Sequence, residues 1–179
     1  MPLAATHILV PLLLAAIIRD IYLKKRKNKN FPLHYVLIAG LGGILPDMDV
    51  ALFWLLYFFN FTFEQVHKTI LHSILISAAF FLLFILFRKT KINFGNKKLK
   101  LSIIFLMLAV GIIIHLILDL LFGEPYLILF PFSSIKVSIN LISYLPYPLQ
   151  GLAMPSLDAV LLVIWLVYLE WKHKISDFI

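Results

Sequence analysis

The sequence predicts an all-α integral membrane protein, a helical bundle with about five transmembrane helices in a single membrane-embedded domain, residues 1–179. Hydrophobic residues make up 62% of the 179 residues and charged residues only 14%, whereas soluble domains are about 45–50% apolar and about 25% charged. Several apolar runs approach or exceed the roughly 20 residues that a helix needs to cross a bilayer. No linker or repeat divides the chain into separate domains.

The positive charge of the chain is placed as in a membrane protein. The formal net charge is +7, and most lysines and arginines gather in two clusters, residues 24–29 and 88–100, which flank apolar runs. This placement is typical of membrane topology and not of a nucleic-acid interface, so no nucleic-acid partner is expected. The sequence has no cysteine, which excludes disulfides and thiolate metal sites.

The first half of the chain contains two predicted spans and a shorter segment. Residues 3–22 form the first span, and the basic cluster follows this run, whereas a signal peptide carries its positive charges before the apolar region. Residues 32–45 form a glycine-rich run, a composition that allows close helix packing, and Pro46 is expected to stop or kink the helix. Residues 50–59 are too few to span, so we expect a re-entrant or interfacial segment.

The second half contains three predicted spans, residues 69–87, 101–123 and 156–171. Between the last two lies a proline-containing connection, residues 124–155, which we expect to lie on the membrane surface or to cover helix ends. The positive-inside rule places both basic clusters and the C-terminus in the cytoplasm and the N-terminus outside. The sequence therefore predicts a multi-pass protein of the cell's inner membrane.

The span at 101–123 carries the most informative pair of residues, His115 and Asp119. Ionisable groups inside a membrane span are costly and call for a functional or structural explanation. The two residues are four apart, so they lie on the same face of a helix, one turn from each other. An imidazole and a carboxylate at this spacing can hold one cation, as in HExxH helices. The alternative is a purely structural hydrogen bond between helices.

Other ionisable residues fall at the same, outer side of the membrane under this topology. They are His7, Asp47, Asp49, His67, His72 and Asp158. With His115 and Asp119 they make eight residues. One shared pocket explains this agreement better than scattered anomalies. His67 and His72 are five apart, about 140° around a helix, so both reach one point only if a helix begins between them.

The donor types of this pocket indicate a metal site. Histidine nitrogens and carboxylate oxygens without thiolates suit zinc, manganese or iron, so we expect a divalent metal, zinc first, as one or two ions. Each residue also has a structural alternative: a helix cap for Asp47 and for Asp158, solvation of a turn for Asp49, an interfacial role for His7. Glu64 and Glu124 are further outer acids without a spacing argument.

Five ordered motifs resemble a known family. They are Thr6-His7, GGILPDMD at 42–49, HKTILHS at 67–73, HLILD at 115–119 and LFPFS at 129–133. Together they resemble the prokaryotic inner-membrane metal-dependent hydrolases, described as LexA-binding, inner membrane-associated hydrolases. The chain departs from the family pattern at Lys68, where arginine is usual, at Leu71, where threonine is usual, and at residues 121–124.

A more distant resemblance is to the all-α zinc-dependent phospholipases C and single-strand nucleases. Their ligand order is matched here by His7, Asp47, His72, His115 and Asp119. Their later His/His/Glu set has no counterpart after Asp119, so one or two metals fit better than three. The resemblance implies hydrolysis of a phosphoester, including one on a lipid.

We therefore expect a membrane-bound metal-dependent hydrolase acting on a phosphoester or lipid-like substrate at the outer membrane face, with the lipid bilayer as its partner. The expected metal ligands are His7, Asp47, His72, His115 and Asp119. Asp49 or His67 would orient the attacking water, while Lys68, as a point charge for phosphate, and Ser73 would contact the substrate.

Two alternatives remain. A metal or proton transporter would need ionisable residues through the whole membrane depth. A non-catalytic scaffold would hold a structural ion in a closed site, whereas a hydrolase must leave a position open for water.

Overall fold

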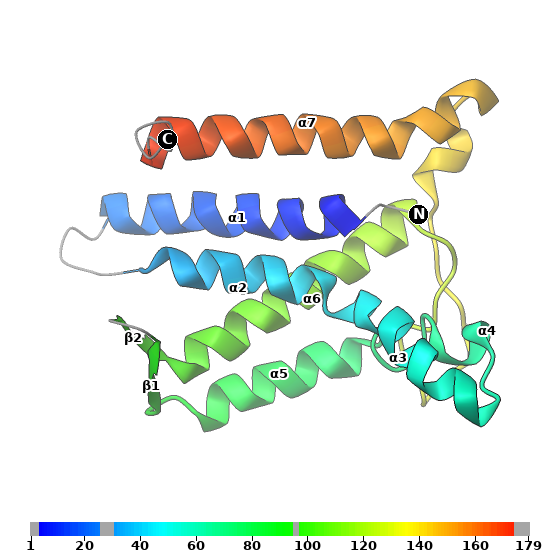
Figure 1. The fold of residues 1–179 in the computed structure, drawn as a ribbon, viewed down its shortest axis with the longest axis horizontal. Helices are drawn as coiled ribbons and strands as arrows, with labels where there is room; N and C mark the ends of the chain where they lie inside the picture. The colour runs from blue at the N-terminus through cyan, green and yellow to red at the C-terminus, as the bar shows by residue number, and fades with distance from the viewer. Residues whose placement is uncertain (1–3, 26–30, 95–96, 174–179) are drawn as a thin grey trace.

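Five helices run between the two ends of an elongated bundle (Figure 1). The computed structural model describes residues 4–25, 31–94 and 97–173. The five helices are α1 (Ala4–Lys25), α2 (Leu33–Ile44), α5 (Ile74–Leu86), α6 (Leu101–Phe122) and α7 (Tyr147–His173). This helical, membrane-type architecture confirms the predicted all-α fold class.

Shorter elements connect the five helices. The segment between α2 and α5 contains η1 (Pro46–Met48), α3 (Asp49–Leu56), η2 (Tyr57–Phe59) and α4 (Phe63–Val66). A two-stranded sheet, β1 (Lys91–Phe94) and β2 (Lys97–Lys100), precedes α6, and η3 (Leu141–Tyr144) precedes α7.

The bundle is held together by close helix approaches at glycine. Helix α2 packs against α1 and α6, α6 also packs against α5, and α7 lies along α1 (Figure 1). A Cβ atom at Gly43 would lie 2.0 Å from the carbonyl oxygen of His7, and one at Gly111 would lie 2.2 Å from that of Ala39. Only glycine allows backbones this near to each other, as in other membrane bundles. The α1–α2–α6 contact therefore depends on these two residues.

Three of the helices, α1, α6 and α7, are long and apolar enough to span a membrane. Helix α2 passes this test only together with residues 46–59, from which it is bent by 51°. Helix α5 has 13 residues, about 20 Å of helix, which is shorter than a bilayer core of about 30 Å. The expectation of five crossings therefore stays a prediction.

Two predicted boundaries in the first half are settled by local chemistry. The proline at position 46 begins η1 and the chain bends there, as expected. The span expected from residue 69 begins as a helix only at Ile74, because Ser73 is the N-cap and its side chain accepts a hydrogen bond from the Leu75 N–H. Residues 67–72 are therefore not helical.

The β1–β2 hairpin was not predicted. Its sequence is rich in lysine, a composition that is typical of loops and depleted in strands. The hairpin is attached to the bundle through buried Leu99 and through the Lys100 N–H, which donates to the Tyr35 hydroxyl at 2.7 Å. Contact with α2 thus stabilises a structure that local propensity disfavours.

The connection after α6 is shorter than predicted, because α7 begins at Tyr147 and not at 156. Pro148 lies in the first helical turn, where its missing N–H is not needed. Pro155 lies inside the helix and removes one backbone hydrogen bond. Asp158 is consequently three turns inside α7, so the expectation that it sits near a helix start is wrong.

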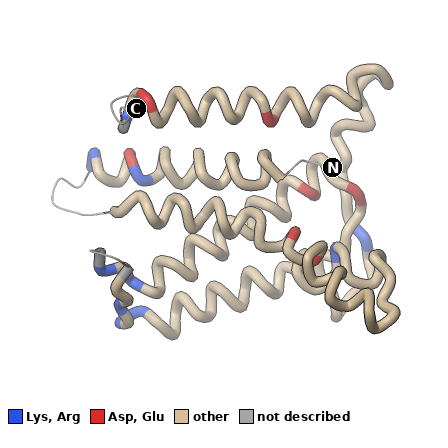
Figure 2. Tube along the Cα trace, viewed as in Figure 1, with Lys and Arg blue, Asp and Glu red and all other residues tan. Residues whose placement is uncertain are grey.

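Charge is distributed unequally between the two ends of the bundle. Figure 2 shows lysines and arginines at the end that holds the β-hairpin and the C-terminal part of α7, opposite the end where α3, α4 and the start of α1 lie. The positive-inside rule predicts that the hairpin end faces the cytoplasm, and this orientation stays a prediction. We call the opposite end of the bundle, which holds the start of α1, the site end.

Candidate metal centre

Ionisable side chains from four elements meet inside the site end. His7 belongs to the first turn of α1, Asp47 to η1, and His115 and Asp119 to the last two turns of α6, while His72 precedes α5. All but Asp47 are fully buried. The structure thus brings together the five residues that the sequence predicts as metal ligands. We call these five residues the cluster.

The orientation of His115 is fixed by the backbone of α2. Its Nδ1 atom lies 2.7 Å from the carbonyl oxygen of Gly43. Because a carbonyl only accepts hydrogen bonds, Nδ1 carries the proton. In the neutral ring the Nε2 atom then presents a lone pair, and this atom points to His72 and Asp119.

His72 presents the same atom to the same point. Its Nδ1 lies 3.0 Å from Asp49 Oδ2, a close charge contact that is not aligned as a hydrogen bond. Its Nε2 lies 3.2 Å from the Nε2 of His115. Two imidazole lone pairs at this distance repel each other unless a proton or a metal ion lies between them.

Asp49 positions the histidines and does not itself face the cluster. Its Oδ1 accepts a hydrogen bond from His67 Nδ1 at 3.0 Å, and its Oδ2 accepts one from the Lys68 N–H at 2.9 Å. A buried carboxylate that holds a ligand imidazole is the usual outer partner of a metal-bound histidine. His67 and His72 both reach Asp49 because α4 ends at Val66 and α5 has not yet begun.

Three atoms at the cluster have the spacing of metal ligands. His72 Nε2, His115 Nε2 and Asp119 Oδ2 lie 3.2 to 3.6 Å from one another. Asp47 Oδ1 lies 3.7 Å from each of the two imidazole nitrogens. The ligands of a tetrahedral zinc ion with bonds of about 2.0–2.1 Å lie roughly 3.3 Å apart. The three atoms of His72, His115 and Asp119 therefore fit such an ion with only small movements, and Asp47 lies beside the two imidazoles.

His7 adds a fifth donor beside the other Asp119 oxygen. Its Nε2 lies 3.5 Å from Asp119 Oδ1, and its ring stacks on that of His115 with centroids 3.9 Å apart. His7, Asp47 and His115 form a second group whose ligand atoms lie within 4.8 Å of one another. Asp119 directs Oδ2 toward His72 and His115 and Oδ1 toward His7. This arrangement suits one or two ions.

The Asp119 carboxylate is not satisfied by the residues around it. Both of its oxygens are buried, and neither accepts a hydrogen bond from any residue that the structure describes. An unpaired buried charge is expensive, whereas a bound divalent ion would compensate it. This observation is the strongest sign that the cluster is built for a cation.

Two cavities are connected to the cluster through neighbouring residues, although none of the five predicted ligands lines either cavity. The first, which we call the lysine cavity, has a volume of about 300 Å³, and the residues that line it include His67, Lys68, Glu124, Tyr126 and Lys136. Through His67 it adjoins Asp49. At the cluster itself the Asp47 side chain is 24% exposed, so the ligand set is not sealed from outside.

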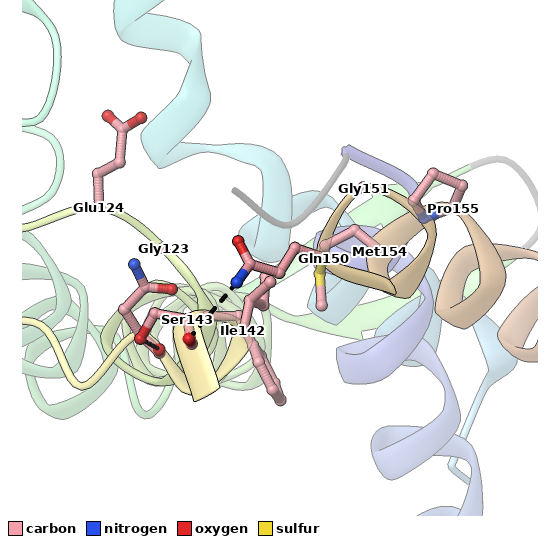
Figure 3. A pocket seen from close by; sticks show the side chains of 10 residues that line it. Gly123, Glu124, Ile142, Ser143, Gln150, Gly151, Met154 and Pro155 are labelled. Atoms are coloured by element: carbon pink, nitrogen blue, oxygen red, sulfur yellow. Dashed lines mark hydrogen bonds between the residues drawn. The ribbon is translucent and has the colours of Figure 1, made fainter. Parts of the chain in front are cut away.

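The second cavity, of about 410 Å³, lies between the end of α6 and the start of α7. Figure 3 shows the Gln150 amide directed toward Ser143, with Glu124 pointing away from it. Gly123 also lines this cavity, and a Cβ atom there would lie 2.9 Å from Asp119 Oδ1. The glycine thus brings this cavity close to the cluster.

Tyr126 covers the cluster from the connection after α6. It is buried, its hydroxyl donates to the Leu116 carbonyl at 2.8 Å, and its ring lies edge-on to that of His72. Burial, together with the nearby Asp119 carboxylate, raises the pKa of Tyr126 to about 12. The tyrosine is therefore a neutral hydrogen-bond donor at physiological pH.

The remaining predicted residues have different places. Ser73 is 1% exposed, and its hydroxyl donates to the Phe130 carbonyl at 2.8 Å while capping α5. The hydroxyl is thus buried and already paired, and its predicted contact with substrate stays a prediction. Lys68 does line the lysine cavity, and Asp158 accepts a hydrogen bond from Thr6. The side chain of Glu64 lies outside the described part of the chain.

Three contributors were not predicted. Gly43 was noted only as part of a packing motif, although its carbonyl orients His115. Tyr126 and Lys136 lie in the irregular connection, where no periodicity signals their direction. Lys136 does carry one sequence signal, because it is a basic residue outside both predicted cytoplasmic clusters.

Comparison with known proteins supports the membrane assignment. A family model described as YdjM inner membrane protein matches residues 1–174, nearly the whole chain. No curated protein and no solved structure matches the chain significantly. The match supports a location in the inner membrane, while the resemblance to hydrolases and phospholipases C stays a prediction.

Proposed function

This chain belongs to the YdjM inner membrane protein family, and from that premise we propose that it is a metal-dependent hydrolase embedded in the inner membrane. The observation that carries the proposal is the convergence of three histidines and two aspartates, with both Asp119 oxygens buried beside imidazole nitrogens and accepting no hydrogen bond from the described residues. The proposed site lies at the outer face, and the proposed substrate is a phosphoester or a lipid-like ester.

In this proposal His72, His115 and Asp119 hold the ion, and Asp47 borders its fourth, open position. His7 with the second Asp119 oxygen provides the place for another ion. The nitrogen and oxygen donors favour zinc, and the two carboxylates would also accept manganese. A bound ion of this kind would supply Lewis-acid catalysis of ester hydrolysis.

The protein's own residues provide position and proton transfer. Asp49 holds His67 and contacts His72, so one carboxylate fixes two imidazoles. Because both Asp49 oxygens are engaged, we assign the predicted role toward water to His67, which lines the lysine cavity. A histidine that is held at Nδ1 and open at Nε2 is suited to general acid–base catalysis.

The exposure of Asp47 favours catalysis over a purely structural ion. A structural metal site is closed by four protein ligands, whereas a catalytic site leaves one position open. Asp47 is the one predicted ligand in contact with solvent, beside four buried ones. Its side is where a substrate or a water could approach.

The apolar middle of the bundle argues against an ion path. Helix α6 has no ionisable residue between Leu101 and His115, and α1 has none between His7 and Arg19. A transporter would need polar groups across the membrane depth. The second polar group of α1, Arg19 with Asp20, lies at the hairpin end.

The test is metal analysis and ester hydrolysis with detergent-purified full-length protein. We expect stoichiometric zinc or manganese in the wild type, and loss of both metal and phosphoester hydrolysis in a His115→Ala, Asp119→Ala double variant. His34→Ala is the matched control, since this histidine lies in the first turn of α2, at the opposite end of the bundle. A wild type that takes up neither metal after reconstitution would contradict the proposal.

A further inference from the structure

Two basic residues stand apart from all the others in the chain. Of the 16 lysines and arginines, 14 belong to residues 19–29, 88–100 and 172–174, and those of them that the structure describes lie at the hairpin end. The other two, Lys68 and Lys136, both line the lysine cavity. Figure 2 shows basic positions at the site end of the bundle as well as at the hairpin end. Two isolated cations in one cavity beside the metal cluster call for an anionic occupant.

Lys68 is held in an unusual backbone conformation. Its φ angle is +58°, in the left-handed region, which costs a residue with a side chain about 1–2 kcal/mol. This conformation allows its N–H to donate to Asp49 Oδ2 while its side chain reaches the lysine cavity. Strain of this kind persists where surrounding contacts enforce it, and it gathers at functional sites.

The Lys68 ammonium is buried but poorly neutralised. The residue is only 7% exposed, and among the described residues its acidic partner is Glu124, whose Oε2 lies 3.9 Å from the Lys68 Nζ. The Glu124 side chain is 72% exposed, so water screens its charge and it can move aside. A buried ammonium with a weak counter-ion is a ready site for an anion.

Lys136 approaches the same cavity from the opposite strand of a short pairing. The Tyr126 and Val137 backbones exchange hydrogen bonds of 3.2 and 3.0 Å, which hold Lys136 across from residues 125–127. Lys136 is exposed and forms no ion pair with an acid in the described part of the chain. Its charge is therefore available.

We infer that the lysine cavity is a phosphate subsite, in which Lys68 and Lys136 bind the phosphoryl oxygens of the substrate and Glu124 is the carboxylate that the phosphate displaces. This inference rests on the proposed hydrolase function and names its substrate class, a phosphate ester. The subsite adjoins the cluster because His67 lines the cavity and shares Asp49 with His72.

The ester could belong to a lipid or to a soluble molecule, and a binding experiment distinguishes the two. Isothermal titration of the detergent-purified full chain would use glycerol 3-phosphate and dihexanoyl phosphatidic acid, each with bound metal and after chelation. At least tenfold tighter binding of the phosphatidic acid assigns a lipid, and equal binding assigns a soluble phosphate ester. Both results support the subsite if they depend on the two lysines.

The variants test that dependence. Lys68→Met keeps the alkyl chain and removes the charge, so we expect roughly tenfold or greater loss of affinity. Lys136→Gln should lower the affinity only a few-fold, because this lysine is exposed. Lys68→Arg, which keeps the positive charge, should retain most of the wild-type affinity. Lys98→Gln, in the distant hairpin, is the matched control and should change nothing.

Two outcomes separate this inference from the proposed function. If neither phosphate ester binds, or if Lys68→Met binds as tightly as the wild type, the subsite is wrong even when metal content is normal. If the lysine-dependent binding persists in a protein that takes up no metal, the subsite stands and the hydrolase proposal fails.

Discussion

Replacing Asp119 by asparagine should change stability in opposite directions with and without metal. Both Asp119 oxygens are buried without a hydrogen-bond donor among the described residues, and three imidazole Nε2 atoms lie 3.5 to 3.6 Å away. Without metal, asparagine removes a buried charge and adds an N–H₂ donor toward those nitrogens. We therefore expect the metal-free variant to be more stable than the metal-free wild type by about 1–3 kcal/mol.

With metal the order reverses. Zinc at 100 times its dissociation constant would stabilise the wild type by about 2.7 kcal/mol, which for a chain of this size raises the melting temperature by roughly 5–10 °C. Asparagine, a neutral and weaker ligand, should lose most of this shift. The assay is thermal unfolding in detergent, with chelator and with zinc. Equal zinc-induced shifts in both proteins, or a metal-free variant less stable than the wild type, would refute the reasoning.

Three further variants test the supporting structure. Gly43→Ala should lower the free energy of unfolding by about 1–3 kcal/mol and lower the metal content, because its methyl group would push α1 away from α2. Thermal unfolding and metal analysis would check this. The control is Gly151→Ala, where no atom lies within 4 Å of the added methyl group. Asp49→Ala should weaken metal binding about 10–100-fold, measured by competition with a chelator, and unchanged affinity would exclude its positioning role. Ser73→Ala should lower the free energy of unfolding by about 1 kcal/mol, because α5 loses its N-cap. The affinity for phosphate esters should not change. A large loss of that affinity would support Ser73 as a substrate contact.

The sequence was most informative where the signal is local. The spacing of His115 and Asp119 on one helix face follows from helix geometry, and the structure has this arrangement. The kink at Pro46 follows from the missing N–H of proline. The grouping of eight ionisable residues at one side followed from the alternation of apolar runs and basic clusters, which reflects the cost of moving charge across a bilayer.

Local pattern was less informative where a contact from elsewhere in the chain decides the outcome. The Ser73 hydroxyl is paired with the Phe130 carbonyl, 57 residues away. Asp158 resembled a helix cap, but α7 extends back to Tyr147 and the carboxylate accepts a hydrogen bond from Thr6 of α1. The lysine-rich hairpin is stabilised by Tyr35 of α2.

The sequence by itself determined that this is a helical membrane protein with eight of its histidines and aspartates gathered at one end, because span length, apolar content and helical spacing are properties of short segments. Only the tertiary structure decided which aspartate faces the candidate ion and which one holds the histidines. Asp47 and Asp49 are two residues apart, yet the break at η1 directs Asp47 to the cluster and Asp49 to His67 and His72. The direction of a side chain at a helix break depends on what packs around it, and that information is spread over α1, α2 and α6.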